Sequence, residues 1–237
     1  MMKAKQMTAK IVAVFNQKGG CAKTMSTMQL GGTLGDMGFD VFIVDMDPQN
    51  TAALWALQAD AENPFPATVL SMAPLRENFI EKLGQHISKN HIILIDCPPS
   101  LESRVPWVSL LIADLAIIPV IPVLDNVWAS KQAEELVQRA RESRKEKNVS
   151  GELKAAYLLS ATRRGKVFDM CQGILEEKAQ IPILDTKIAL RNVFPESQVY
   201  GCVAGSFGKN AGASDFNKLA KEVIALLDIE IPKGKGK

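Results

Sequence analysis

The chain has no closely spaced cysteine pair, no long uninterrupted hydrophobic run and almost no net charge. Its four cysteines are far apart and follow no secretory signal, so no disulfide framework is expected and a reducing cytoplasm is the simplest setting. The most apolar segment, residues 108–124, is interrupted by Asp114, Pro119 and Pro122, which argues against a membrane span. A formal charge of +2 creates only a weak overall field, so any binding to nucleic acid must come from local basic clusters.

Short apolar runs alternate with segments of helical spacing along the whole chain. Helical spacing is clearest in residues 129–147, where Ala133, Leu136, Val137 and Ala140 form one apolar stripe. Continuous apolar runs are typical of strands that are buried on both faces of a parallel sheet. These runs occupy residues 10–16, 40–47, 91–99, 115–123 and 154–162. The pattern predicts a single-domain, doubly wound α/β fold, in which a mostly parallel sheet carries helices on both faces and binds ligands at the carboxyl ends of its strands.

The ends of the chain differ in composition from its middle. We expect residues 1–9 to form a flexible N-terminus, residues 10–230 to form the folded domain, and the Gly- and Lys-rich residues 231–237 to form a flexible tail. Residues 216–227 are amphipathic and are followed by acidic and proline residues. A last helix packed on the sheet explains this segment better than a membrane-binding helix does.

A glycine-rich stretch, "NQKGGCAKTMST" at residues 16–27, follows the first predicted strand and opens a predicted helix. In such a loop, main-chain amides and the positive end of the helix dipole face bound phosphates. Lys23 would reach the β and γ phosphates, and the Thr24 hydroxyl would bind magnesium. The stretch departs twice from the standard pattern G-x-x-x-x-G-K-[ST], with Gln17 and Ala22 at the two glycine positions. The residues expected to contact a nucleotide are Lys18, Gly19, Gly20, Cys21, Ala22, Lys23, Thr24 and Met25.

Two later strands end in aspartate. Asp96 closes "HIILID" and is well placed to hold hydrated magnesium beside the loop, although capping of a strand end is the alternative interpretation. Asp45 and Asp47 lie two residues apart in "VDMDPQN", so on a strand they would share a face and both could point toward a nucleotide. Their alternative interpretation is a polar strand end before a proline turn.

The segments "KGGCAKT", "VDMDPQN" and "IDCPPS" resemble, in order and spacing, the deviant Walker A, switch I and Walker B with switch II of the ParA/MinD ATPases. The resemblance implies a P-loop ATPase domain that uses ATP and Mg²⁺ and hydrolyses slowly. It also implies that Lys18 contacts the partner's ATP across a nucleotide-sandwich homodimer. By the same resemblance Asp47 orients the attacking water and Asp45 supports the magnesium shell. Ala22 departs from the commoner glycine of the family, which is expected to slow turnover.

Weaker signals concern partners. In partitioning members of the family, basic residues of the C-terminal third bind DNA without sequence preference once ATP has built the dimer. Here Arg163, Arg164, Lys166 and Arg191 are the candidates, with a solvated basic rim or a contact to the nucleotide base as alternatives. The basic residues of 139–147 are offset by glutamates and indicate an ordinary exposed helix face.

Three functions compete. The first is a ParA-type ATPase, nucleoid-associated in a bacterial cytoplasm, which positions a plasmid, chromosome region or other cargo with a ParB-like or other small adaptor. The second is a MinD-like ATPase on the membrane, and the third is a P-loop kinase. A membrane form needs an exposed amphipathic C-terminal helix, so no stable membrane association is expected. A kinase needs an acceptor pocket, for which the sequence has no distinct motif.

Overall fold

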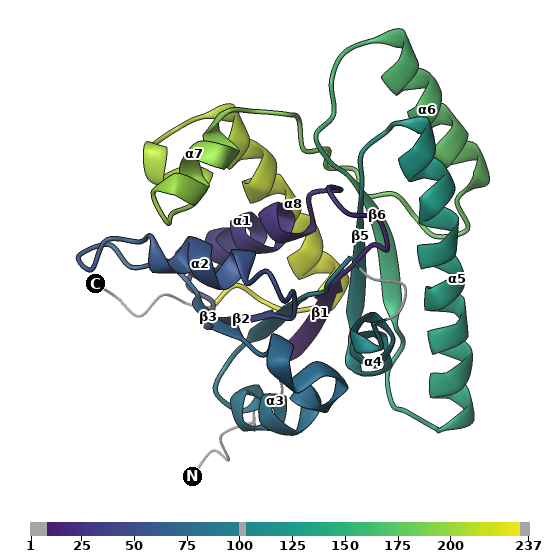
Figure 1. The fold of residues 1–237 in the computed structure, drawn as a ribbon, viewed down its shortest axis with the longest axis horizontal. Coiled ribbons are helices and arrows are strands. Elements are labelled where there is room, and N and C mark those ends of the chain that lie inside the picture. Colours follow the sequence, from purple (N-terminus) through teal and green to yellow (C-terminus); the bar gives the residue numbers. More distant parts are fainter. Residues whose placement is uncertain (1–8, 100–102, 233–237) are drawn as a thin grey trace.

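The computed structural model describes residues 9–99 and 103–232, and its centre is a six-stranded sheet (Figure 1). The strands are β1 (Lys10–Val14), β2 (Val41–Asp45), β3 (Thr68–Ser71), β4 (Ile92–Asp96), β5 (Leu115–Val120) and β6 (Lys154–Leu159). They lie in the order β3-β2-β4-β1-β5-β6, and each pairing between neighbours is parallel. The predicted fold class is therefore confirmed.

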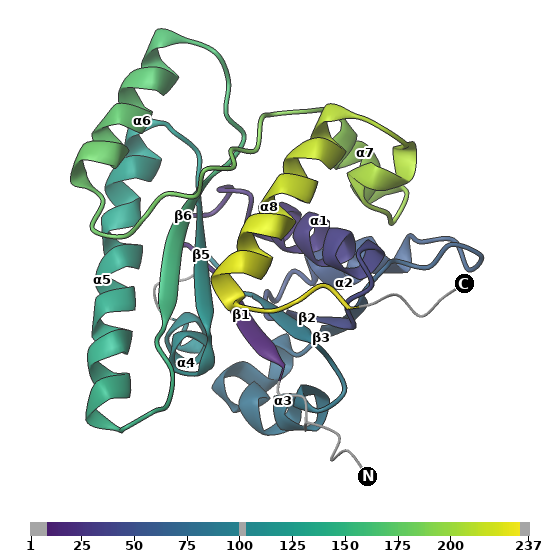
Figure 2. The same cartoon turned by 180° about the vertical axis from the view of Figure 1, so that it is seen from behind.

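Helices cover both faces of this sheet. They are α1 (Lys23–Asp36), α2 (Thr51–Leu57), α3 (Phe79–Ile87), α4 (Val105–Ile112), α5 (Leu124–Glu146), α6 (Lys166–Lys178), α7 (Val193–Val199) and α8 (Ala211–Leu227), with short 3₁₀ helices η1 (Ala73–Asn78) and η2 (Ala204–Phe207). The apolar residues of α1, α2, α7 and α8 pack on one face, and those of α3, α4, α5 and α6 pack on the other. Figures 1 and 2 show α8 lying along α1, on the opposite side of the sheet from α5.

Strand β1 shows why the runs were apolar throughout. Ile11 and Ala13 belong to the core on the α5 side, whereas Val12 and Val14 belong to the core on the α1 side. Because successive side chains of a strand point to opposite faces, a central strand covered on both faces needs apolar residues at every position. The sheet thus divides the interior into two apolar layers.

Several element boundaries differ from the sequence prediction. Strand β3 was not predicted, because it is a short edge strand whose side chains alternate between exposed and half-buried. Helix α5 begins at Leu124, five residues earlier than expected, and only residues 121–123 separate it from the end of β5 at Val120. Helix α8 begins at Ala211, because the Asn210 side chain accepts a hydrogen bond from the Ala213 amide at 2.9 Å and caps the helix.

The C-terminal amphipathic helix packs on the sheet, as predicted. Phe216, Leu219 and Val223 of α8 are fully buried in the apolar layer that also contains α1. At the other end Ala9 is buried and its amide donates to Ile87 O at 3.2 Å, so it belongs to the folded domain and not to a flexible N-terminus. The predictions for residues 1–8 and 233–237 lie outside the described residues. Across residues 9–99 and 103–232, the helices are too short or too polar to cross a membrane.

The order of the strands determines which edge of the sheet can bind a ligand. Strand β1 lies between β4 and β5, so the connections that leave β1 and β4 meet at the carboxyl end of the sheet, where α/β sheets bind ligands. Helix α1, which follows β1, packs closely against the segment before β3: a Cβ added to Gly35 would clash with Pro66 O. This close contact fixes the direction in which the N-terminus of α1 points.

Candidate nucleotide-binding site

The loop between β1 and α1 is held in place by Asn16. This side chain is buried, and its Nδ2 donates to Pro119 O of β5 at 2.9 Å. Its Oδ1 accepts the Lys18 amide at 3.1 Å. The loop is therefore tied to the neighbouring strand at its first turn. Asn16 was not among the predicted site residues, because an asparagine at a strand end is common in any turn.

Ala22 occupies the second glycine position of the standard pattern. It is the residue before α1 and has φ 70° and ψ 27°, the left-handed conformation, while Gly20 has φ 72°. A glycine adopts this conformation without strain, whereas an alanine at such a position costs about 1 kcal/mol. Ala22 therefore holds backbone strain at a position where the standard motif has glycine.

Lys23 lies folded over its own loop. It is buried, and its Nζ donates to Lys18 O at 3.0 Å and lies 3.8 Å from Cys21 Sγ. Cys21 is also buried, and its thiol donates to the same carbonyl at 3.1 Å. The ammonium group thus sits inside the loop at the N-terminus of α1, where the helix dipole also favours an anion.

Asp96 supplies a buried carboxylate beside this loop. Its Oδ1 accepts the Thr27 hydroxyl of α1 at 3.2 Å, whereas its Oδ2 is buried and has no hydrogen bond. Burial raises the pKa of Asp96 to about 7, although the nearby Thr24 hydroxyl lowers it. An unpaired oxygen next to a threonine hydroxyl fits a hydrated Mg²⁺, which needs only one or two protein ligands. The described residues contain no larger cluster of acidic, His or Cys ligands.

Asp45 and Asp47 do not share one strand face, because β2 ends at Asp45. Asp45 is fully buried, and its two oxygens accept the amides of Asp47 at 3.1 Å and Ala53 at 3.0 Å. Burial raises the pKa of Asp45, while the hydrogen bond from Ala53 lowers it. Asp45 therefore holds the turn after β2 and the start of α2. Asp47 is partly exposed, and its Oδ1 accepts the Gln49 amide at 2.9 Å.

Lys18 points away from the loop interior. Its Nζ lies 3.9 Å from Asp125 Oδ2 in the first turn of α5, and the side chains are 41% and 75% exposed. An ion pair this exposed contributes little to stability and is easily exchanged for another partner. Lys18 is thus the more exposed lysine of the loop, in contrast to the buried Lys23.

An apolar pocket of about 550 Å³ adjoins the loop. Its lining combines the loop with residues that follow β5 and β6, so it lies at the same edge of the sheet. It is lined by Gly20, Ala22, Met25, Trp55, Ile121, Val123, Ala161, Arg163, Phe168, Ala189, Leu190, Arg191, Phe194, Pro195 and Gln198. Its size and apolar walls suit a nucleotide base whose phosphates lie on the loop. Most of this lining was not predicted, because it comes from several separate segments without a motif.

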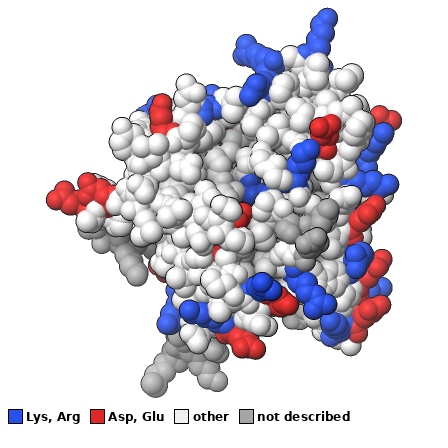
Figure 3. Space-filling model, in the orientation of Figure 1, with Lys and Arg blue, Asp and Glu red and all other residues white. Residues whose placement is uncertain are grey.

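The four basic candidates lie at the same end of the molecule. Main-chain hydrogen bonds from Thr162 to Ile188 O and from Leu190 to Thr162 O, both 3.0 Å, bring the segments of Arg163 and Arg191 together. Both arginines line the apolar pocket. Figure 3 shows Lys and Arg side chains along the upper edge, where Figure 1 places the loop into α6.

These cations differ in what they are free to bind. Arg191 donates through Nε and Nη2 to Asp215 Oδ2, each at 2.9 Å, whereas Arg163, Arg164 and Lys166 are exposed. Among the basic residues of α5, Arg144 is not on an exposed face as expected. It is buried and donates to the carbonyls of Leu110 and Gly151, each at 3.2 Å, so it serves the packing of α4 and α5.

Comparison with known proteins identifies the family. The model of the CobQ/CobB/MinD/ParA nucleotide-binding domain (CbiA) matches residues 12–227. The chain belongs to this family. Over 227 residues it is 29% identical to maintenance of carboxysome distribution protein A from Halothiobacillus neapolitanus, covering 90% of this chain and 95% of that protein. The recognised ParA/MinD resemblance is thereby confirmed.

Solved structures of this family share the fold. Apo McdA from Cyanothece superposes with a TM-score of 0.73 at 16% identity, covering 91% of this chain and 99% of that one. The septum site-determining protein MinD from Pyrococcus horikoshii OT3, in complex with Mg-ADP, superposes with a TM-score of 0.70 at 23% identity, covering 91% and 96%.

The strain at Ala22 yields a first prediction. Ala22→Gly removes the cost of the left-handed alanine and should raise the free energy of unfolding by about 1 kcal/mol. The measurement is urea unfolding of the nucleotide-free chain. Gly84→Ala is the reverse control: an added Cβ there has no atom within 4 Å, so alanine should stabilise α3 by a similar amount. Destabilisation by Ala22→Gly would contradict the strained loop.

Proposed function

We propose that this protein is a ParA-type ATPase that forms an ATP-bound homodimer, binds duplex DNA without sequence preference and positions a cellular cargo in the cytoplasm. The observation that carries the proposal is that one phosphate loop contains two lysines whose surroundings differ. Lys23 is buried at the start of α1, whereas the Lys18 side chain is 41% exposed and faces Asp125 of α5. One lysine can serve the nucleotide of its own subunit while the other reaches a partner.

Binding of ATP follows from the geometry of the loop. Lys23 and the loop amides would hold the phosphates, and the apolar pocket beside Met25 would hold the base. Thr24 and Asp96 would hold Mg²⁺, which neutralises charge on the phosphates during transfer. The unpaired Oδ2 of Asp96 supports this assignment. Binding therefore uses residues of a single subunit.

Hydrolysis requires the dimer in this proposal. Lys18 would place a second cation on the phosphates of the partner's ATP, as an arginine finger does in other enzymes. Asp47, fixed by its amide hydrogen bond to Asp45, would orient the attacking water. A single subunit lacks the partner's lysine, so its intrinsic hydrolysis is slow.

In this proposal, DNA binding rests on exposed basic residues just before and at the start of α6. Arg163, Arg164 and Lys166 are exposed, and dimerisation doubles their number on one body. Arg191 contributes less to this surface, because Asp215 already binds its guanidinium group. Since phosphate contacts release counterions, the affinity should fall steeply as salt is raised.

The class of cargo and partner is suggested by relatives. One relative is named for carboxysome distribution, and others are named ParA and the sporulation initiation inhibitor Soj. We propose a cargo of this range, linked through a small adaptor protein. The MinD-like alternative is less favoured, because the apolar face of α8 is buried against the sheet and so is occupied within the described structure.

A second prediction separates binding from chemistry. Lys18→Ala should still bind ATP but fail to dimerise on it, and its hydrolysis should fall at least ~100-fold if the lysine acts as a finger. Asp47→Ala should bind ATP and lose hydrolysis. Light scattering, nucleotide binding and phosphate release measure the three properties. The matched control is Lys89→Ala, an exposed lysine in the turn that follows α3. Normal dimerisation and hydrolysis by Lys18→Ala would exclude a contact in trans.

A third prediction tests DNA binding. With a non-hydrolysed ATP analogue the protein should bind duplex DNA of any sequence, whereas with ADP it should bind weakly. Arg164→Ala with Lys166→Ala should weaken binding at least ~10-fold and reduce the salt dependence, because each phosphate contact contributes a slope of about −0.9. Titrations at low and high salt measure both effects.

The controls for this experiment separate the sites. Lys218→Ala with Lys221→Ala removes two exposed lysines of α8 and should leave DNA binding unchanged. A liposome-sedimentation assay runs in parallel with anionic vesicles. Binding to these vesicles without binding to DNA would refute the proposed function and favour the MinD-like alternative.

A further inference from the structure

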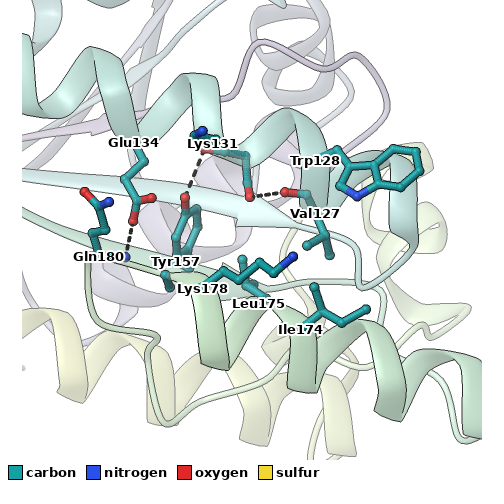
Figure 4. A pocket seen from close by; sticks show the side chains of 11 residues that line it. Val127, Trp128, Lys131, Glu134, Tyr157, Ile174, Leu175, Lys178 and Gln180 are labelled. Carbon is teal, nitrogen blue, oxygen red and sulfur yellow. Dashed lines mark hydrogen bonds between the residues drawn. The ribbon is translucent and has the colours of Figure 1, made fainter.

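A second cavity lies between α5, α6 and β6, apart from the nucleotide-binding edge. It has a volume of about 500 Å³. It is lined by Val127, Trp128, Ser130, Lys131, Glu134, Tyr157, Ile174, Leu175, Lys178, Ala179 and Gln180 (Figure 4). None of these residues belongs to the phosphate loop or to the apolar base pocket. The proposed ATPase mechanism therefore leaves this cavity without a role.

Glu134 gives the cavity an unused hydrogen-bond acceptor. The residue is 6% exposed, and its Oε1 accepts the amides of Gln180 at 2.6 Å and Ile181 at 3.0 Å. Its Oε2 makes no hydrogen bond to any residue in the described part of the chain. In contrast, the Tyr157 hydroxyl donates to Ser130 O at 3.0 Å and is satisfied. Figure 4 shows the Glu134 carboxylate at one end of the view and Trp128 at the other. A carboxylate oxygen that lines the cavity without a protein partner can accept a hydrogen bond from a ligand.

An exposed apolar stripe continues from the cavity along α6. Trp128 is 63% exposed and Met170 is 57% exposed, although both are large apolar side chains. Met170, Ile174 and Lys178 are each four residues apart, so they lie on one face of α6. Trp and Met side chains exposed together are typical of protein interaction sites. The stripe extends past the cavity, which favours an extended peptide segment over a small molecule.

The charge of the cavity indicates the chemistry of the segment. Lys131 and Lys178 line it, and both are exposed. Lys131 makes only an exposed ion pair with Glu135 at 4.0 Å, and Lys178 has no ion pair among the described residues. Two exposed cations beside an apolar stripe complement a segment that carries acidic residues next to apolar ones.

We propose that the groove formed by Trp128, Lys131, Glu134, Met170, Ile174 and Lys178 is the docking site for an acidic amphipathic segment of a partner protein. Apolar side chains of the segment contact Trp128, Met170 and Ile174. Its acidic residues pair with Lys131 and Lys178, and a main-chain amide donates to Glu134 Oε2. If the proposed function holds, this partner is a candidate for the adaptor. The docking itself does not depend on ATP.

The test draws its ligands from a random library, so the partner need not be identified beforehand. Random peptides of about 12 residues, displayed on phage, are selected on the immobilised full chain without nucleotide. The selected peptides should combine apolar residues with Asp or Glu. Synthetic copies should bind the wild-type chain and lose at least ~10-fold in affinity to Trp128→Ala and to Lys178→Glu. Both side chains are exposed, so these variants should fold normally, which thermal unfolding checks.

Charge reversal and matched variants make the test specific. Selection on Lys131→Glu/Lys178→Glu should enrich basic peptides instead. Lys218→Glu on α8 and Val199→Ala on α7 alter exposed residues elsewhere and should leave peptide affinity unchanged. Absence of enriched peptides, or equal affinity for Trp128→Ala and wild type, would overturn the proposal. A change in the oligomeric state of the free chain on Trp128→Ala would also overturn it, by assigning the groove to a second copy. If the wild-type chain dimerised normally on ATP but bound no peptide, the docking site would be refuted and the proposed ATPase function would stand.

Discussion

The buried carboxylate of Asp96 is the constraint on which the rest of the site depends. The sheet order places β4 next to β1, so the last residue of β4 lies beside the first turn of α1. A charged carboxylate at this depth is costly unless a cation or hydrogen-bond donors compensate it. Its Oδ2 has no hydrogen bond, and burial raises its pKa to about 7. The fold thus places a buried carboxylate oxygen without a hydrogen bond next to the phosphate loop.

Residues around Asp96 divide the work between structure and binding. Asp45 is its neighbour on β2. Both carboxylate oxygens of Asp45 accept hydrogen bonds from main-chain amides, which orders the turn that carries Asp47. Asn16 ties the phosphate loop to β5. Polar groups that are fully satisfied make the loops rigid, whereas the unpaired Oδ2 of Asp96 remains available for a ligand.

The sequence predicts those features of the structure that a local residue pattern determines. Central strands were predictable because burial on both faces requires apolar residues at every position, and the phosphate loop was predictable because its chemistry needs a short contiguous motif. The edge strand β3 has no such pattern. The base pocket combines distant segments, and the partners of Arg144 and Arg191 are set by tertiary packing, so basic residues that are equivalent in sequence have different roles. The docking groove is invisible in sequence for the same reason.

The most direct test of the account is to measure the binding of ADP by calorimetry, with either Mg²⁺ or EDTA present, for wild type and Asp96→Asn. Each titration is done at two pH values, about one pH unit above and about one pH unit below the Asp96 pKa of about 7. Asp169→Asn, an exposed carboxylate of α6, is the control. The account predicts that Mg²⁺ strengthens binding to wild type above that pKa. The gain should shrink below it, because a proton must first leave Asp96, and Asp96→Asn should show no gain at either pH. A full Mg²⁺-dependent gain in Asp96→Asn would contradict the assignment of Asp96 to the cation.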